Sequence, residues 1–131
     1  MNTVLFDLDG TLLPMDQEAF VRLYFSALTH KFEPYGFDPQ KLVQGLWAGM
    51  KAMQENDGSK TNEDAFWQAF TGLAGERALD YRSDFDAFYR NEFAAAKKAT
   101  VCHPMAARCV HLLREKGYRV ALATNPLFPQ A

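Results

Sequence analysis

The sequence has few of the features that mark secreted, metal-stapled or membrane-spanning proteins. Only two cysteines occur in its 131 residues, Cys102 and Cys109, and their spacing matches neither a zinc ligand pair nor a redox CxxC motif. The N-terminus has no basic segment and meets an acidic residue at position 7, so we do not expect a signal peptide. No apolar run approaches the roughly 20 residues that a membrane span needs. We therefore expect a cytoplasmic protein with reduced thiols.

The sequence also lacks a strong excess of charge of either sign. Its 14 basic and 16 acidic residues give a formal net charge of -2, so composition does not suggest nucleic acid or an anionic membrane as a partner. Hydrophobic residues make up 48% and charged residues 23%, which is typical of a soluble globular protein. Aromatic residues are abundant, and most of them lie between residues 20 and 93.

Two short apolar runs, residues 3–8 and 118–123, are predicted to be buried β-strands. The first is followed by an Asp-Gly turn, and the second is stopped by Thr-Asn-Pro at residues 124–126. A helix that begins at Pro104 and ends at Gly117 precedes the second strand. Because a long crossover separates the strands, we expect them to pair in parallel within an α/β fold.

The crossover, residues 16–98, has the apolar periodicity of about four helices and contains no convincing strand. Helix starts are predicted at three capping residues, Asp38, Thr61 and Ser83. The apolar stripes of these helices are expected to place Trp47 and Leu73 in the core. An insertion of this length far exceeds an ordinary connection, so it should form a small domain of its own.

Two carboxylates, Asp7 and Asp9, lie at the end of the first predicted strand. Gly10 permits the tight turn that would let both carboxylates converge and would bring backbone N–H groups close to a ligand. In open α/β sheets, ligands bind at the carboxyl ends of the parallel strands. Since carboxylates are also the ligands that Mg²⁺ prefers, the sequence predicts a magnesium site at this edge.

Two segments resemble motifs of the haloacid dehalogenase (HAD) superfamily. Residues 4–13, VLFDLDGTLL, are similar to the first motif at every position, and residues 112–125, LLREKGYRVALATN, resemble the segment that ends in the second motif. The resemblance implies the first two strands of a HAD Rossmann-like parallel core, residues 1–14 and 99–131. It also implies that residues 15–98 are a helical cap of the C1 type, which closes over the substrate.

The resemblance further implies the roles of the site residues. Asp7 would be the nucleophile that forms an aspartyl-phosphate, and Asp9 would protonate the leaving alcohol and then activate water. The Asp7 carboxylate and the Asp9 backbone carbonyl would also bind the Mg²⁺ cofactor. Phosphate binding would fall to four residues, of which the first two begin a mobile flap: Gly10, Thr11, Thr124 and Asn125.

An acid at position 9 favours phosphoryl transfer over dehalogenation, so we expect a phosphatase that acts on a small phosphorylated metabolite. The lysine and acidic residues of the third and fourth family motifs have no match here. We therefore expect a truncated chain with little or no activity, whose exposed core self-associates. Two alternatives stay open: a phosphomutase, or a non-catalytic HAD-derived protein that binds a partner through its aromatic cap.

Overall fold

A computed structural model describes residues 2–124, and within this range the chain divides into two units. Residues 2–23 and 96–124 form one of them, here called the α/β unit, and residues 24–95 form the helical unit. The division falls inside helix α1 (Gln17–Phe32). The domain boundaries expected near residues 15 and 98 stay predictions.

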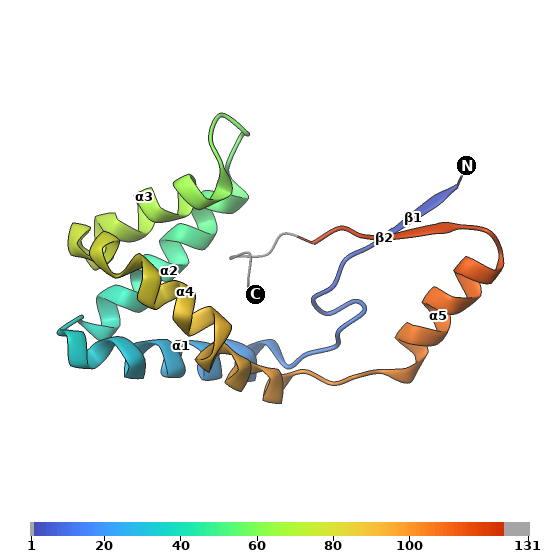
Figure 1. The fold of residues 1–131 in the computed structure, drawn as a ribbon, viewed down its shortest axis with the longest axis horizontal. Coiled ribbons are helices and arrows are strands. Elements are labelled where there is room, and N and C mark those ends of the chain that lie inside the picture. Colours follow the sequence, from blue (N-terminus) through green and yellow to red (C-terminus); the bar gives the residue numbers. More distant parts are fainter. Residues whose placement is uncertain (1, 125–131) are drawn as a thin grey trace. The chain divides into compact units, whose positions relative to one another are not determined.

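The α/β unit contains a parallel pair of strands, as the sequence predicted (Figure 1). Strand β1 (Thr3–Phe6) pairs with β2 (Arg119–Leu122) in a register that sets Val4 beside Val120. Parallel pairing is possible because the intervening crossover is long enough to return the chain to the same end of the sheet. The predicted fold class, a partial α/β core with a helical insertion, is confirmed.

Helix α5 (Pro104–Glu115) leads into β2. Proline suits the first turn of a helix, and the ring nitrogen Nδ1 of His103 caps this turn by accepting a hydrogen bond from the N–H of Met105 at 3.2 Å. Gly117 follows the helix with φ +83°, a left-handed conformation that glycine adopts without strain. Both ends of this helix therefore lie where the sequence predicted them.

The prediction that the two strands are buried is wrong. Leu5 is 65% exposed and Leu122 is 54% exposed, and α5 has no buried residue. The strands are exposed because few other elements pack against them. Helix α5 packs against β2, but no further strand pairs with the two-stranded sheet within residues 2–124. The strands form through their backbone bonds without an apolar core around them.

The expected helices are present between the two strands, and none of the helices within residues 2–124 is long and apolar enough to cross a membrane. After α1, three α-helices follow before α5, and short 3₁₀ segments lie between α1 and α2, between α3 and α4, and after α4. Their bounds are α2 (Pro39–Gln54), α3 (Asn62–Ala74) and α4 (Arg82–Arg90), with η1 (Glu33–Tyr35), η2 (Glu76–Tyr81) and η3 (Glu92–Ala99).

Two of the three predicted helix caps are confirmed. The carboxylate of Asp38 accepts hydrogen bonds from the N–H groups of Gln40 and Lys41, the second and third residues of α2, and the Thr61 hydroxyl accepts one from the N–H of Asp64 in α3. The third cap, Ser83, is wrong, because α4 begins one residue earlier and follows directly from η2 without a side-chain cap. A preceding 3₁₀ turn continues into the helix there, so no separate cap starts it.

Aromatic rings form the core of the helical unit. Phe32 and Phe85 stack with their centroids 4.0 Å apart, and Trp67 and Phe70 each meet the Phe85 ring edge-on. All of the largest fully buried side chains of the described chain lie within residues 24–95: Tyr24, Leu28, Phe32, Leu42, Leu46, Phe66, Phe70, Phe85 and Phe88.

Two residues that the periodicity placed in this core are not buried there. Trp47 is 52% exposed and Leu73 is 45% exposed, although both follow the apolar spacing of their helices. Trp47 instead lies edge-on against Phe25, with the ring centroids 5.4 Å apart. The apolar periodicity predicts which side of a helix faces the neighbouring helices, but those helices cover only part of the apolar stripe.

A buried hydroxyl pair connects α1 to α4 inside the same core. The hydroxyls of Tyr24 and Tyr89 are hydrogen-bonded to each other, and burial raises the pKa of both phenols well above the usual range. Both side chains therefore stay neutral at physiological pH. The bond satisfies polar atoms that would otherwise be costly to bury.

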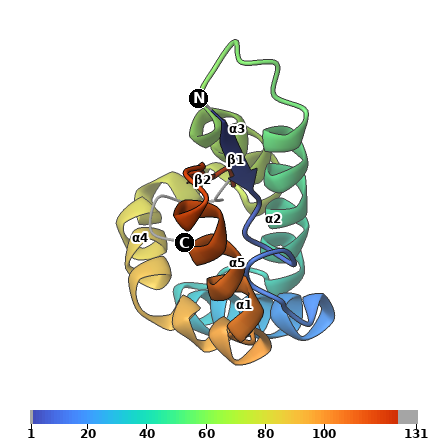
Figure 2. The same cartoon turned by 90° about the vertical axis from the view of Figure 1, so that its right-hand side faces the viewer.

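Helices α2 and α3 lie side by side (Figure 2). They pack closely because two glycines of α2 face phenylalanines of α3. A Cβ atom built on Gly45 would lie 2.9 Å from the Phe70 ring, and one built on Gly49 would overlap the Phe66 ring more severely. The absence of these two Cβ atoms lets the phenylalanine rings lie directly against the α2 backbone.

We predict that Gly49→Ala lowers the free energy of unfolding by about 1–2 kcal/mol, because overpacking outweighs the better helix propensity of alanine. Gly45→Ala should be less damaging, since its clash is milder. Chemical denaturation monitored by circular dichroism measures both changes. Gly72→Ala in α3 is the matched control, and it should stabilise by up to about 1 kcal/mol because no atom lies within 4 Å of the new methyl group. Equal effects of all three substitutions would contradict this account.

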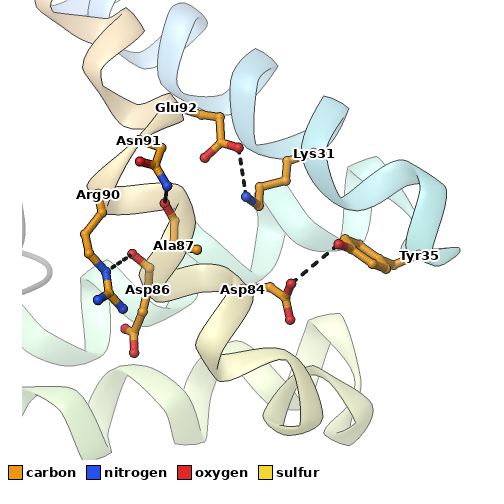
Figure 3. Close-up of polar contacts among 8 residues, drawn as sticks. All are labelled: Lys31, Tyr35, Asp84, Asp86, Ala87, Arg90, Asn91 and Glu92. Carbon is orange, nitrogen blue, oxygen red and sulfur yellow. Dashed lines mark hydrogen bonds and ion pairs between the residues drawn. The ribbon is translucent and has the colours of Figure 1, made fainter.

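Polar contacts on the surface of the helical unit join segments that are distant in sequence (Figure 3). The Lys31 ammonium donates to the Glu92 carboxylate at 2.8 Å, and the Tyr35 hydroxyl donates to Asp84 at 3.4 Å. The hydrogen bond from Lys31 lowers the pKa of Glu92 below its usual range. Because the lysine stabilises the ionised form, folding favours deprotonation of this carboxyl group.

The Lys31–Glu92 pair should make a small, pH-dependent contribution to stability. Since the pKa of Glu92 is lowered in the folded state, this contribution is present above the unfolded-state pKa and is lost as the pH falls through the folded-state pKa. We predict that Glu92→Gln costs about 0.2–1 kcal/mol near neutral pH, the size expected for an exposed pair, and costs less in acid. Denaturation at several pH values measures the difference. Glu76→Gln is the control, and a Glu92→Gln effect independent of pH would contradict the assignment.

Candidate functional site

A closed loop follows β1 and holds the first site residues. The carbonyl of Leu8 accepts hydrogen bonds from the N–H groups of Thr11 at 3.1 Å and Leu13 at 2.8 Å, and the Leu13 carbonyl accepts one from Gly10 at 2.9 Å. Gly10 has φ +73°, so the chain reverses here in a conformation that strains other residues. The tight turn predicted at residues 9–11 is therefore present.

Two exposed carboxylates flank the beginning of this loop. Asp7 is the first residue after β1, and the backbone of Asp9 forms an isolated bridge with Leu13. Within residues 2–124, neither carboxylate takes part in a hydrogen bond or an ion pair. Their oxygens are consequently available to a cation or to a reacting group.

The end of β2 brings Thr124 to the same edge of the sheet. The N–H of Ala123 donates to the carbonyl of Phe6, the last residue of β1, at 2.7 Å, which extends the backbone pairing one residue beyond β2. Asp7 and Thr124 therefore follow the carboxyl ends of two hydrogen-bonded parallel strands. Asn125, the remaining predicted phosphate-binding residue, lies outside the described residues.

Backbone bonds also join the segment that follows the loop to the segment that precedes α5. Met15 and Thr100 form an antiparallel bridge, and the N–H of Val101 donates to the carbonyl of Pro14 at 2.9 Å. This bridge holds the segment after the Asp7–Leu13 loop against the segment that precedes α5. The loop is thus anchored at both of its ends by backbone bonds.

The pair Asp7 and Asp9 fits a magnesium ion better than a transition metal. Carboxylate oxygens are hard ligands, and Mg²⁺ usually takes one or two carboxylates and completes its octahedron with water and substrate phosphate. Zinc sites need three or four His, Cys or acidic ligands, and no cluster of three such residues exists within residues 2–124. The donor set therefore fits the cofactor that the sequence predicted.

A second concave site, on the helical unit, was not anticipated from the sequence. A cavity of about 540 Å³ lies beside the loop between α2 and α3, and Asn56, Lys60 and Gln68 are among its lining residues. The Asn56 amide closes the loop by donating to the Lys60 carbonyl at 3.0 Å and to Asn62 at 2.8 Å. The sequence predicted only a loop here, because such closure depends on where one side chain reaches.

Comparison with known protein families gives one result that covers the whole chain. Residues 1–131 match the family model described as a hydrolase, haloacid dehalogenase-like hydrolase. Neither the curated proteins nor the solved structures contain a significant match. The family expected from residues 4–13 and 112–125 is thereby confirmed.

We predict that Gly10→Ala destabilises the Leu8–Leu13 loop by about 1–2 kcal/mol, the penalty for a left-handed alanine. No atom lies within 4 Å of the new methyl group, so backbone strain alone should cause the loss. Hydrogen exchange of the Leu13 amide measures the free energy of loop opening. Gly10→Asn should lose less, because asparagine tolerates this conformation. Gly58→Ala is the control. Gly58 has φ +86° in another loop, so its substitution should leave hydrogen exchange of the Leu13 amide unchanged. Equal loss for alanine and asparagine would argue against strain as the cause.

Proposed function

Since the chain belongs to the haloacid dehalogenase-like hydrolase family, we propose that it is a Mg²⁺-dependent phosphohydrolase that cleaves small phosphomonoesters through an aspartyl-phosphate. One observation carries the proposal. Within residues 2–124, the exposed carboxylates of Asp7 and Asp9 have no protein partner, and they follow a strand whose parallel neighbour ends at Leu122, two residues before Thr124. The residues 15–98 would act as the cap that excludes water from the reaction.

The first half-reaction uses both carboxylates. A carboxylate oxygen of Asp7 attacks phosphorus and forms a new P–O bond, while the P–O bond to the substrate alcohol breaks. Asp9, in its protonated form, donates a proton to the departing alcohol oxygen and becomes a carboxylate. An acid at position 9 is needed because an alkoxide is a poor leaving group, and this is the feature that favours a phosphoester over a halide substrate.

The second half-reaction returns the site to its starting state. The Asp9 carboxylate takes a proton from water, and the water oxygen attacks phosphorus as the bond to Asp7 breaks. Inorganic phosphate leaves, Asp7 is again a carboxylate, and Asp9 is again protonated. Both steps require Asp7 to reach phosphorus while Asp9 reaches the oxygen that leaves or attacks it, and their spacing of two residues beside a tight turn suits this.

The phosphoryl group carries charge that the site must balance. A Mg²⁺ held by the Asp7 carboxylate and the Asp9 backbone carbonyl would neutralise the phosphoryl oxygens and reduce repulsion between the substrate and the nucleophile. The hydroxyls of Thr11 and Thr124 would donate hydrogen bonds to the same oxygens, together with Asn125, whereas the N–H groups of Gly10 and Thr11 hold the loop closed. Donors fixed by the backbone pairing cost no reorganisation when the charge develops.

Because no residues of this chain match the third and fourth family motifs, we expect little turnover, and formation of the aspartyl-phosphate is therefore the step to measure. We predict that the purified chain, treated with Mg²⁺ and acetyl phosphate, gains one phosphoryl group on Asp7. Acetate leaves without a proton, so Asp9→Asn should still be phosphorylated. Its adduct should hydrolyse about 10²–10⁴-fold more slowly, because no general base activates water. Asp7→Asn should give no adduct. Intact-mass spectrometry followed by peptide mapping measures the extent, position and lifetime of the modification.

Asp80→Asn, an exposed aspartate in η2, is the matched control and should behave as the unchanged chain does. Two other outcomes correspond to the alternatives. A wild-type adduct that persists until a phosphosugar is added would indicate a phosphomutase. The absence of an adduct in every variant, with Mg²⁺ present, would contradict the proposal and favour a non-catalytic interaction protein.

A further inference from the structure

The dipeptide Asp-Gly occurs twice in this chain, at Asp9–Gly10 and at Asp57–Gly58. The first belongs to the proposed catalytic loop, whereas the second lies in the loop between α2 and α3, to which the proposed function assigns no role. This loop projects beyond the ends of both helices (Figure 1), and Asp57 and Gly58 are exposed in it. Exposed loop tips are common sites of covalent change to a chain, such as proteolytic cleavage.

The carboxyl group of Asp57 is folded back over the peptide bond that follows it. Its Oδ1 atom accepts a hydrogen bond from the N–H of Ser59 at 2.9 Å. This bond closes a ring that contains both the Cγ atom of Asp57 and the backbone nitrogen of Gly58. A nucleophilic nitrogen and an electrophilic carbon held in one small ring react faster than the same groups in an open chain.

The backbone nitrogen of Gly58 is also accessible to this carbon. Glycine has no side chain to shield its nitrogen, and a Cβ atom built on Gly58 would meet no atom within 4 Å. The Gly58 N–H donates a long hydrogen bond, 3.3 Å, to Oδ1 of Asn56. A bond of this length holds the nitrogen weakly.

Asp9–Gly10 has the same two residues but a different environment. The N–H of Gly10 donates to the backbone carbonyl of Leu13 at 2.9 Å, and the Leu8 carbonyl accepts two further bonds that close the same loop. Attack by the Gly10 nitrogen would break its bond and open the loop. Within residues 2–124, the Asp9 carboxylate forms no hydrogen bond that would fold it over Gly10.

We propose that Asp57 is a site of spontaneous isomerisation, at which the chain rearranges to an isoaspartyl linkage through a cyclic imide with Gly58. The Gly58 nitrogen bonds to Cγ of Asp57, and its proton leaves as water with the hydroxyl of the protonated carboxyl group. A second water then adds to the backbone carbonyl carbon of Asp57 and breaks the bond from that carbon to the Gly58 nitrogen. The main chain of the product runs through the side chain of Asp57 and is longer by one methylene group, and the former carbonyl is a free carboxylate.

The rearrangement would change the wall of the cavity beside this loop. Asp57 lines that cavity together with two residues of opposite charge, Glu55 and Lys60. The hydrogen bond from Ser59 lowers the pKa of Asp57 below its usual range. Since a carboxylate is a poorer electrophile than a protonated carboxyl group, the rearrangement is slower in neutral solution than in mild acid.

Incubation of the complete chain in mildly acidic heavy-oxygen water, followed by peptide mapping, tests the proposal. Hydrolysis of the imide adds one heavy oxygen atom at its aspartate, so the label records ring formation. We expect Asp57 to be labelled severalfold faster than Asp9 in the folded chain. In urea the two sites should be labelled at similar rates, because only the folded loops distinguish them. A ratio of rates that is no larger in the folded chain than in urea would overturn the proposal.

Amide variants remove the influence of carboxyl ionisation. Asp57→Asn should form the same ring with loss of ammonia in neutral solution, and intact-mass spectrometry detects the replacement of nitrogen by oxygen. Asp9→Asn should change more slowly, because the Gly10 nitrogen is held in its loop, and Asp80→Asn, which precedes Tyr81, is the control and should change least. If Asp9→Asn changed as fast as Asp57→Asn, the loop geometry would not be the cause. None of these measurements uses phosphoryl transfer, so the modification and the proposed activity succeed or fail separately.

Discussion

Parallel pairing of β1 with β2 is the interaction on which the candidate site depends. The paired segments, residues 3–6 and 119–122, are separated by the whole helical insertion, and the backbone bonds between them bring the two ends of the α/β unit together. Asp7 and Thr124 share an edge only because the ladder continues to the bond from Ala123 to Phe6. If this pairing were lost, Asp7 and its loop would remain intact, but the phosphate-binding hydroxyl would not be placed beside it.

The two units of the chain are stabilised in different ways. In the helical unit, stacked and edge-on rings around Phe32, Phe70 and Phe85 provide a dry core, and α2 approaches α3 closely through Gly45 and Gly49. The α/β unit depends on backbone hydrogen bonds and on the contact of α5 with β2, with little apolar burial. Since burial of apolar surface is the main source of stability, the α/β unit should open more readily than the helical unit.

Local features of the fold, such as helix caps, could be predicted from the sequence. The burial of side chains and strands could not, because it depends on which other elements pack against them. Asp38 and Thr61 cap their helices as expected, because a cap bonds to N–H groups only two or three residues away. Ser83 fails because the chain before it is already in a 3₁₀ turn. Trp47, Leu73 and the two strands have the correct apolar pattern but are exposed, since burial requires a second surface that the pattern does not describe.

The site shows the same distinction. The sequence by itself determined the family, the two carboxylates and the glycine turn, because Asp7, Asp9 and Gly10 belong to one short segment whose conformation follows from its own residues. Tertiary structure alone decided that Thr124 lies beside Asp7 at the carboxyl ends of the paired strands. The reason is range: a turn is closed by neighbours in the chain, whereas a strand pair and its coverage depend on contacts between residues far apart in sequence.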